Sequence, residues 1–145
     1  MPDSDAVSPL PPALLPAQLA ALVGGPYTDA DTAGAAGLAA ETIRYLNHAA
    51  PRGGVTDPAT VAAVASELSA MAYRLPQLLS ALGVWLAAEV AAGRVADDHR
   101  RPPGELAAKV RAAFGNADAC ACDLARELST AHNLSATLHA ARSAA

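Results

Sequence analysis

An uninterrupted apolar stripe over residues 61–85 constrains the fold of this chain more than any other feature. Its members follow one another at intervals of three and four residues: Val61, Val64, Leu68, Met71, Leu75, Leu78, Leu82 and Trp85. This spacing is typical of helices that bury one face against other helices. The stripe keeps its register across Pro76, whose ring would clash with the helical carbonyl four residues earlier. The pattern therefore predicts either a kinked continuous helix, which we favour, or two helices that meet at a tight corner.

The composition predicts an all-α fold. Hydrophobic residues make up 52% of the 145 residues and aromatic residues only 3%, so the core must consist mainly of Leu, Val and Ala. Alanine is the best helix former and a poor strand former. No stretch alternates β-branched and polar residues over the length of a strand. A chain of this length fits one domain with a sizeable core.

Capping and breaking residues divide the chain into helices. The sequence predicts helices over 13–23, 30–49, 58–95 and 103–142, with the third kinked or broken at Pro76. Asp57 and Pro58 supply an N-cap and a first helical residue, and residues 1–12 are acidic and proline-rich, which favours disorder. We therefore expect a single domain over 13–145, a four- to five-helix bundle built on a long antiparallel hairpin.

The two arms of this hairpin carry more apolar surface than the shorter helices can cover. Each arm would be roughly 60 Å long at 1.5 Å per residue. The apolar positions expected to form an interface on the last helix are Leu106, Val110, Leu124, Leu128 and Leu138. An exposed surface of this kind closes most simply by pairing with a second copy. The sequence therefore predicts a homodimer.

The charge distribution disfavours binding to nucleic acid or to a membrane. The net charge is −4, and no segment concentrates the positive charge that phosphate neutralisation requires. Residues 6–28 are uncharged, but five prolines interrupt them, and Asp3 and Asp5 stand where a signal peptide has basic residues. We therefore expect a cytoplasmic protein with no membrane segment.

The cysteines and histidines do not form a metal-binding pattern. Cys120 and Cys122 point about 200° apart on a helix, so they cannot hold one ion together. Cys120 lies on the apolar stripe of the last helix and is expected in the core, whereas Cys122 is expected to face outward. His132 and His139 are separated by two turns, roughly 10 Å. No metal site and no cofactor are expected.

One group of polar and aromatic residues is a candidate ligand site: Tyr45, His48, Trp85 and Glu89. Glu89 follows Trp85 by one helical turn, and a carboxylate beside an indole in a pocket would have a raised pKa and could act as an acid or base. The alternative interpretation is that His48 complements a helix C-terminus and that Glu89 is an edge residue. No phosphate-binding loop, nucleophile elbow or pair of catalytic acids accompanies them, which argues against an enzyme.

The sequence thus favours a non-enzymatic helical module for protein–protein interaction, an adaptor or regulatory partner that binds itself and another protein. The alternative is a small-ligand-binding or regulatory bundle with a pocket near Tyr45, His48, Trp85 and Glu89. An interaction module should present an exposed apolar patch, and a ligand binder should enclose a cavity with converging polar groups.

Overall fold

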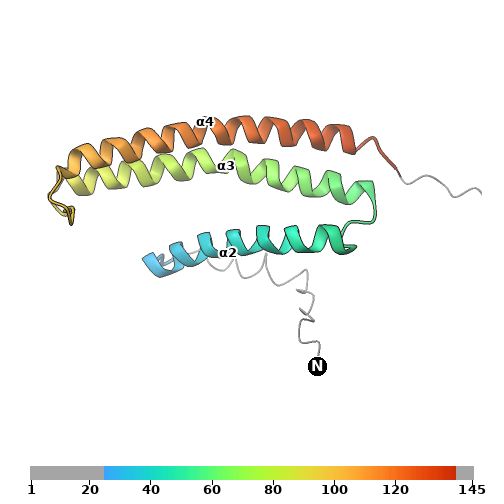
Figure 1. The fold of residues 1–145 in the computed structure, drawn as a ribbon, viewed down its shortest axis with the longest axis horizontal. Helices are drawn as coiled ribbons and strands as arrows, with labels where there is room; N and C mark the ends of the chain where they lie inside the picture. The colour runs from blue at the N-terminus through green and yellow to red at the C-terminus, as the bar shows by residue number, and fades with distance from the viewer. Residues whose placement is uncertain (1–24, 140–145) are drawn as a thin grey trace, which may run out of the picture. The chain divides into compact units, whose positions relative to one another are not determined.

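The computed structural model describes residues 25–139, and these residues are helical apart from short connections (Figure 1). They form α2 (Asp29–Ala49), a 3-10 turn η1 (Ala50–Arg52), α3 (Pro58–Ala91) and α4 (Pro103–Ser135), and no residue of this range lies in a strand. The all-α prediction is confirmed. The predicted count of four to five helices is not supported, since the described range contains three. The expected disorder of 1–12 and the helix over 13–23 fall outside the described residues.

Two compact units divide the chain after Pro51. The first contains α2 and the second contains the hairpin of α3 and α4. The single bundle over 13–145 stays a prediction.

The α2 helix begins where its capping residues predict. The Thr28 hydroxyl accepts a hydrogen bond from the Asp31 backbone N–H at 3.1 Å and donates one to the Asp31 carboxylate at 2.6 Å. Asp29 and Asp31 place negative charge in the first turn, next to the positive end of the helix dipole. None of its residues is buried.

The α3 helix is continuous through Pro76, as the unbroken register of the apolar stripe predicts. It begins at Pro58 with Asp57 as N-cap, whose carboxylate accepts the Ala59 N–H at 2.8 Å. It ends at Ala91, four residues before the predicted boundary. Gly93 has a φ of +70°, and the Arg94 N–H bonds to the Glu89 carbonyl, which is the Schellman arrangement that ends helices.

The connection between the two arms is organised around one carboxylate. Asp97 accepts hydrogen bonds from the backbone N–H groups of His99 and Arg101, both at 3.0 Å, and from the Arg101 guanidinium. The connection lies between the two helices that the sequence predicts as the arms of the hairpin, and α4 begins at Pro103 as predicted. The α4 helix ends at Ser135 rather than at 142, and residues 136–137 form a turn.

Small residues form the contact between α3 and α4, which lie antiparallel and side by side (Figure 1). The buried residues of the two helices are Ala62, Ala65, Ser69, Ala72 and Gly83 on α3, and Ala107, Ala121, Ala125 and Ser135 on α4. We call this set the seam. Its spacings fit a repeat of seven, as in a left-handed coiled coil. The stripe over 61–85 is therefore not the face that α3 buries, because the seam lies one position further along the helix.

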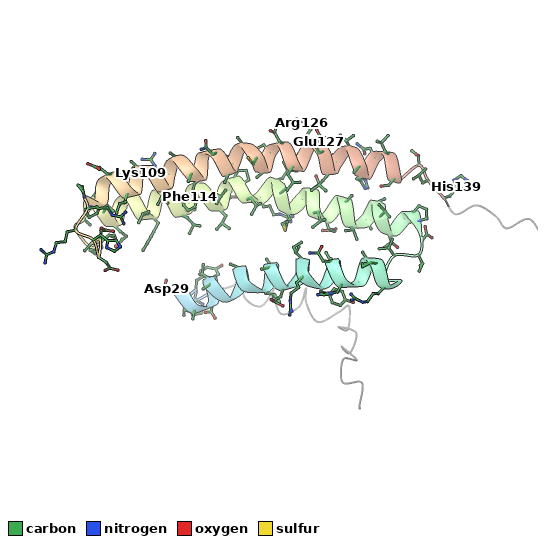
Figure 2. All side chains as sticks on the ribbon, in the orientation of Figure 1. Asp29, Lys109, Phe114, Arg126, Glu127 and His139 are labelled. Carbon is green, nitrogen blue, oxygen red and sulfur yellow. The ribbon has the colours of Figure 1, made fainter. Side chains whose placement is uncertain are left out.

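Two hydrogen-bond contacts across the seam fix the register of the hairpin and show that a side chain of one helix reaches the backbone of the other. The Ser69 hydroxyl donates to the Ala125 carbonyl at 2.9 Å, and His132 Nδ1 lies 2.8 Å from the Ala62 carbonyl oxygen. A Cβ placed on Gly83 would lie 3.4 Å from the Arg111 side chain and 3.6 Å from the ring of Phe114, which is labelled in Figure 2. A serine side chain reaches a partner backbone only where the helices are close, so small seam residues are what this geometry requires.

Candidate functional site

Leu79, Leu86, Phe114 and Leu128 are half-buried and continue the spacing of the seam, whereas most other large apolar side chains of the hairpin lie beside it. On α3 they are the eight residues of the stripe over 61–85. On α4 the corresponding residues are Leu106, Val110, Leu124 and Leu134, and Leu138 follows shortly after the end of that helix. We call these thirteen residues the leucine face. Among them Trp85 is 62% exposed, Leu124 48% and Leu138 62%, while Val64, Leu68, Met71, Leu75 and Leu106 are half-buried. None is fully buried.

Both rows of the leucine face lie on the same side of the hairpin. Stripe residues of α3 precede the seam residues by one position, and so do Leu106, Leu124 and Leu134 on α4. In an antiparallel helix pair, positions that precede the seam on one helix flank the same side as those that precede it on the other. The hairpin therefore presents a mostly apolar surface on that side, with one carboxylate, Glu127, which precedes the seam position of Leu128. Arg126, by contrast, is on the side of α4 that faces away from α3 (Figure 2).

The side of the hairpin that carries the leucine face has roughly the area that one partner contributes to a standard protein interface. It runs for about 36 Å along α3, and two packed helices present a strip roughly 20 Å wide, which gives about 700 Å². A standard interface buries about 800 Å² on each partner. Soluble monomers rarely leave apolar patches of this size uncovered.

The residues predicted to form an interface divide between this face and the seam. Leu106, Val110, Leu124 and Leu138 belong to the leucine face. Leu128 is half-buried and occupies a seam position between Ala125 and His132. Its role at an interface between copies stays a prediction, and its replacement would first disturb the hairpin.

The four residues of the candidate ligand site are divided between the two units. Trp85 and Glu89 lie one turn apart on α3, whereas Tyr45 and His48 lie on α2 in the other unit. The pocket predicted from all four residues stays a prediction.

Glu89 is engaged in an ion pair that sequence reasoning missed. The Arg94 Nε and Nη2 groups donate to its two carboxylate oxygens, both at 2.6 Å. These hydrogen bonds lower the pKa of Glu89 and outweigh the opposing effect of partial burial. A raised pKa, expected if Glu89 stood beside the indole in a pocket, is therefore wrong. The ion pair depends on Gly93, which turns the chain and carries Arg94 back alongside the last turn.

Both cysteines are exposed and free, so the expected core position of Cys120 is wrong. Its neighbour Ala121 occupies the seam instead. The Cys122 thiol lies 3.5 Å from an Asp118 carboxylate oxygen. Desolvation, that hydrogen bond and the nearby negative charge raise the pKa of Cys122, which makes it a poor nucleophile at neutral pH.

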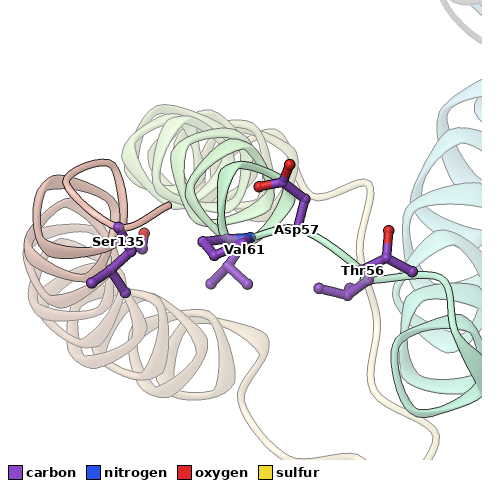
Figure 3. A pocket seen from close by; sticks show the side chains of 7 residues that line it. Thr56, Asp57, Val61 and Ser135 are labelled. Atoms are coloured by element: carbon purple, nitrogen blue, oxygen red, sulfur yellow. The ribbon is translucent and has the colours of Figure 1, made fainter. Parts of the chain in front are cut away.

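A hollow of about 310 Å³ opens at the free end of the hairpin, where α3 begins and α4 ends. Its lining residues are Val55, Thr56, Asp57, Pro58, Val61, Ser135 and Leu138. We call it the end socket. Figure 3 shows Ser135 of α4 beside Val61 of α3, with Asp57 and Thr56 leading into that helix. Val61 and Leu138 belong to the leucine face as well, so the socket is continuous with that face.

A second hollow of about 190 Å³ lies at the other end of the hairpin, beside the loop. Its apolar lining includes Leu86, Val90 and Leu106, and its one charged residue, Asp97, already bonds the loop. It therefore offers no converging free polar groups of the kind that orient a small ligand.

Within 25–139 no three His, Cys, Asp or Glu side chains gather where they would bind a metal ion. No helix in that range combines the length and the apolar character that a bilayer span needs. Comparisons with protein-family models, curated proteins and solved structures gave no match to the chain. The leucine face and its end socket are thus the features of the described residues that best suit a function.

Proposed function

We propose that this chain is a non-enzymatic helical interaction module that self-associates through the leucine face. One observation supports it above all: the fully buried contact between the arms consists of small residues, and most of the large apolar side chains of the hairpin lie on one outer side. A helix that contacts a single neighbour needs only a narrow seam, whereas helices of a four-helix layer carry apolar residues at a further position of the repeat. The width of the apolar surface on α3 and α4 therefore fits a second layer of helices.

A second copy of the chain suits this surface because its α3 row is free of charge. Between Val61 and Trp85 every residue of the stripe is apolar. Two copies can pair there without burying an unpaired ion, which would cost more than the apolar contact gains. An isologous contact is also the commonest way to close such a surface. The α2 helix by itself offers only four large apolar side chains, Leu38, Ile43, Tyr45 and Leu46.

We also propose that the chain binds another protein and that it is located in the cytoplasm. Tyr73 and Val84 are exposed on the other side of the hairpin, where they would stay accessible in a dimer and could anchor another protein in an adaptor or regulatory role. Two exposed free thiols suit a reducing compartment such as the cytoplasm.

A matched pair of variants tests the use of the leucine face. Leu82→Glu places a charge on the face, and Val84→Glu places the same charge on the other side of α3. Sedimentation velocity should show that Leu82→Glu weakens self-association about tenfold or more, because a buried unpaired charge is costly. Val84→Glu should match the wild type. Equal self-association of the two variants, with helical circular dichroism intact, would contradict the proposal.

A further inference from the structure

The stripe on α3 is symmetric about its middle in a way that suits antiparallel pairing with itself. Its intervals of three and four residues read the same from either end, with the centre at Tyr73. A twofold axis at that level would therefore set Met71 opposite Leu75 and Leu68 opposite Leu78 of the other copy. Further out it would set Val64 opposite Leu82, and Val61 opposite Trp85.

Side-chain size is complementary in this pairing. The two valines lie near the N-terminus of α3, and the leucine and tryptophan that would meet them lie near its C-terminus. The end socket adds room on the valine side, since Val61 is one of its lining residues. A tryptophan would therefore meet the smaller side chains and the hollow, rather than another large side chain.

Trp85 has the properties of the group that would fill the socket. It is the only tryptophan in the chain, it is 62% exposed, and it lies about 36 Å along the helix from Val61. Buried aromatic anchors of this kind contribute most to many interfaces. A buried indole N–H needs an acceptor. The socket offers oxygen-bearing side chains in Thr56, Asp57 and Ser135.

We propose that two copies pair antiparallel through α3, with Trp85 of each copy seated in the end socket of the other. This inference rests on the proposed self-association and specifies its geometry. It requires that Trp85 becomes buried when the dimer forms, which a different mode of dimerisation would not require.

The fluorescence of the single tryptophan tests this directly in the full-length chain. Light scattering locates the concentration range of dimerisation, and tryptophan emission and acrylamide quenching are then measured across it. Emission should shift to shorter wavelength, and quenching should fall, in step with dimer formation. Val61→Lys in the socket should weaken dimerisation about tenfold or more. Val84→Lys, with the same change at a position 65% exposed on the other side, should match the wild type.

The possible outcomes separate the two proposals. A dimer whose tryptophan stays red-emitting and open to quenching would overturn the seating of Trp85 and leave self-association standing. A tryptophan shielded equally at all concentrations would also overturn it, because the cover would then come from the same chain. A chain that stays monomeric throughout would overturn self-association itself. Helical circular dichroism of both lysine variants shows whether they fold.

Discussion

Each seam residue is limited in size by the backbone opposite it. Ala72 and Ala125 have no exposed surface, and the Ala125 carbonyl receives the Ser69 hydroxyl. Additional carbon atoms at such a position have no space unless the helices separate. The exposed leucines one position away have no such limit. Enlarging a seam residue should therefore lower the free energy of unfolding, whereas enlarging an exposed residue should leave it nearly unchanged.

Ala125→Leu should destabilise the hairpin by about 1–3 kcal/mol, the usual cost of overpacking. The control is Ala119→Leu, which adds the same atoms at an exposed position of α4 and should change the free energy of unfolding by less than about 0.5 kcal/mol. Urea unfolding followed by circular dichroism at one protein concentration measures both. If the two variants were equally stable, α3 and α4 would not be as close as the seam requires.

The stability of the loop should depend on pH through Asp97. Its hydrogen bonds to the Arg101 side chain, then to the Arg101 and His99 backbone, lower its pKa below the usual value. A carboxylate with a lowered folded-state pKa stabilises the fold above its unfolded-state pKa, about 3.9, and that contribution is lost as the pH falls through the folded-state value. Glu89 follows the same rule through Arg94.

Asp97→Asn should therefore lower the melting temperature at neutral pH, and the difference from wild type should shrink as the pH falls below about 4. Thermal unfolding over a pH series measures this, with the exposed neighbour substitution Asp98→Asn as control. A difference between wild type and Asp97→Asn that stays constant down to the lowest pH would show that the charge of Asp97 contributes nothing.

At the scale of the elements, the helix starts and the end of α2 were predictable, and the ends of α3 and α4 were not. Asp57 with Pro58, Thr28 with Asp31, and Pro103 act locally, so their effect can be read from neighbouring residues. The α3 helix ends where Gly93 adopts a positive φ, and the two alanines before it are strong helix formers that give no sign of the coming end. The Glu89–Arg94 ion pair depends on the same turn, which is why sequence reasoning missed it.

The face that α3 buries was also beyond prediction from periodicity. The seam and the leucine face have the same spacing and differ by one position, so both fit a helix packed on a neighbour. Hydrophobicity favoured the leucines. The structure instead uses alanine, serine and glycine, because these allow the backbones to approach until Ser69 reaches the opposite carbonyl. Because the small residues form the contact between α3 and α4, the leucine face remains on the outside of the hairpin.

Gly83→Ala tests how close the helices are near the loop. An added Cβ would meet Arg111 and Phe114 at ordinary contact distances of 3.4 and 3.6 Å, while alanine favours a helix by about 1 kcal/mol over glycine. The variant should thus be more stable by up to about 1 kcal/mol in urea unfolding. Gly115→Ala, where no atom lies within 4 Å, shows the gain without any contact. A Gly83→Ala variant less stable than wild type would mean that the arms approach more closely there.

At the scale of the whole molecule, the hairpin has two apolar surfaces with different uses. The seam joins α3 to α4, and the leucine face remains on an outer side whose area is near the share of one partner in a standard interface. We expect the full-length chain to cover this face with a second copy. The alternative is that the leucines stay exposed or are covered within the same chain.

Light scattering of the wild-type chain over a concentration series distinguishes these cases most directly. The predicted result is a mass that rises from 14.5 kDa at low concentration to twice that value and then stays constant, as a closed dimer requires. A mass of 14.5 kDa at every concentration, with no partner present, would contradict self-association through the leucine face.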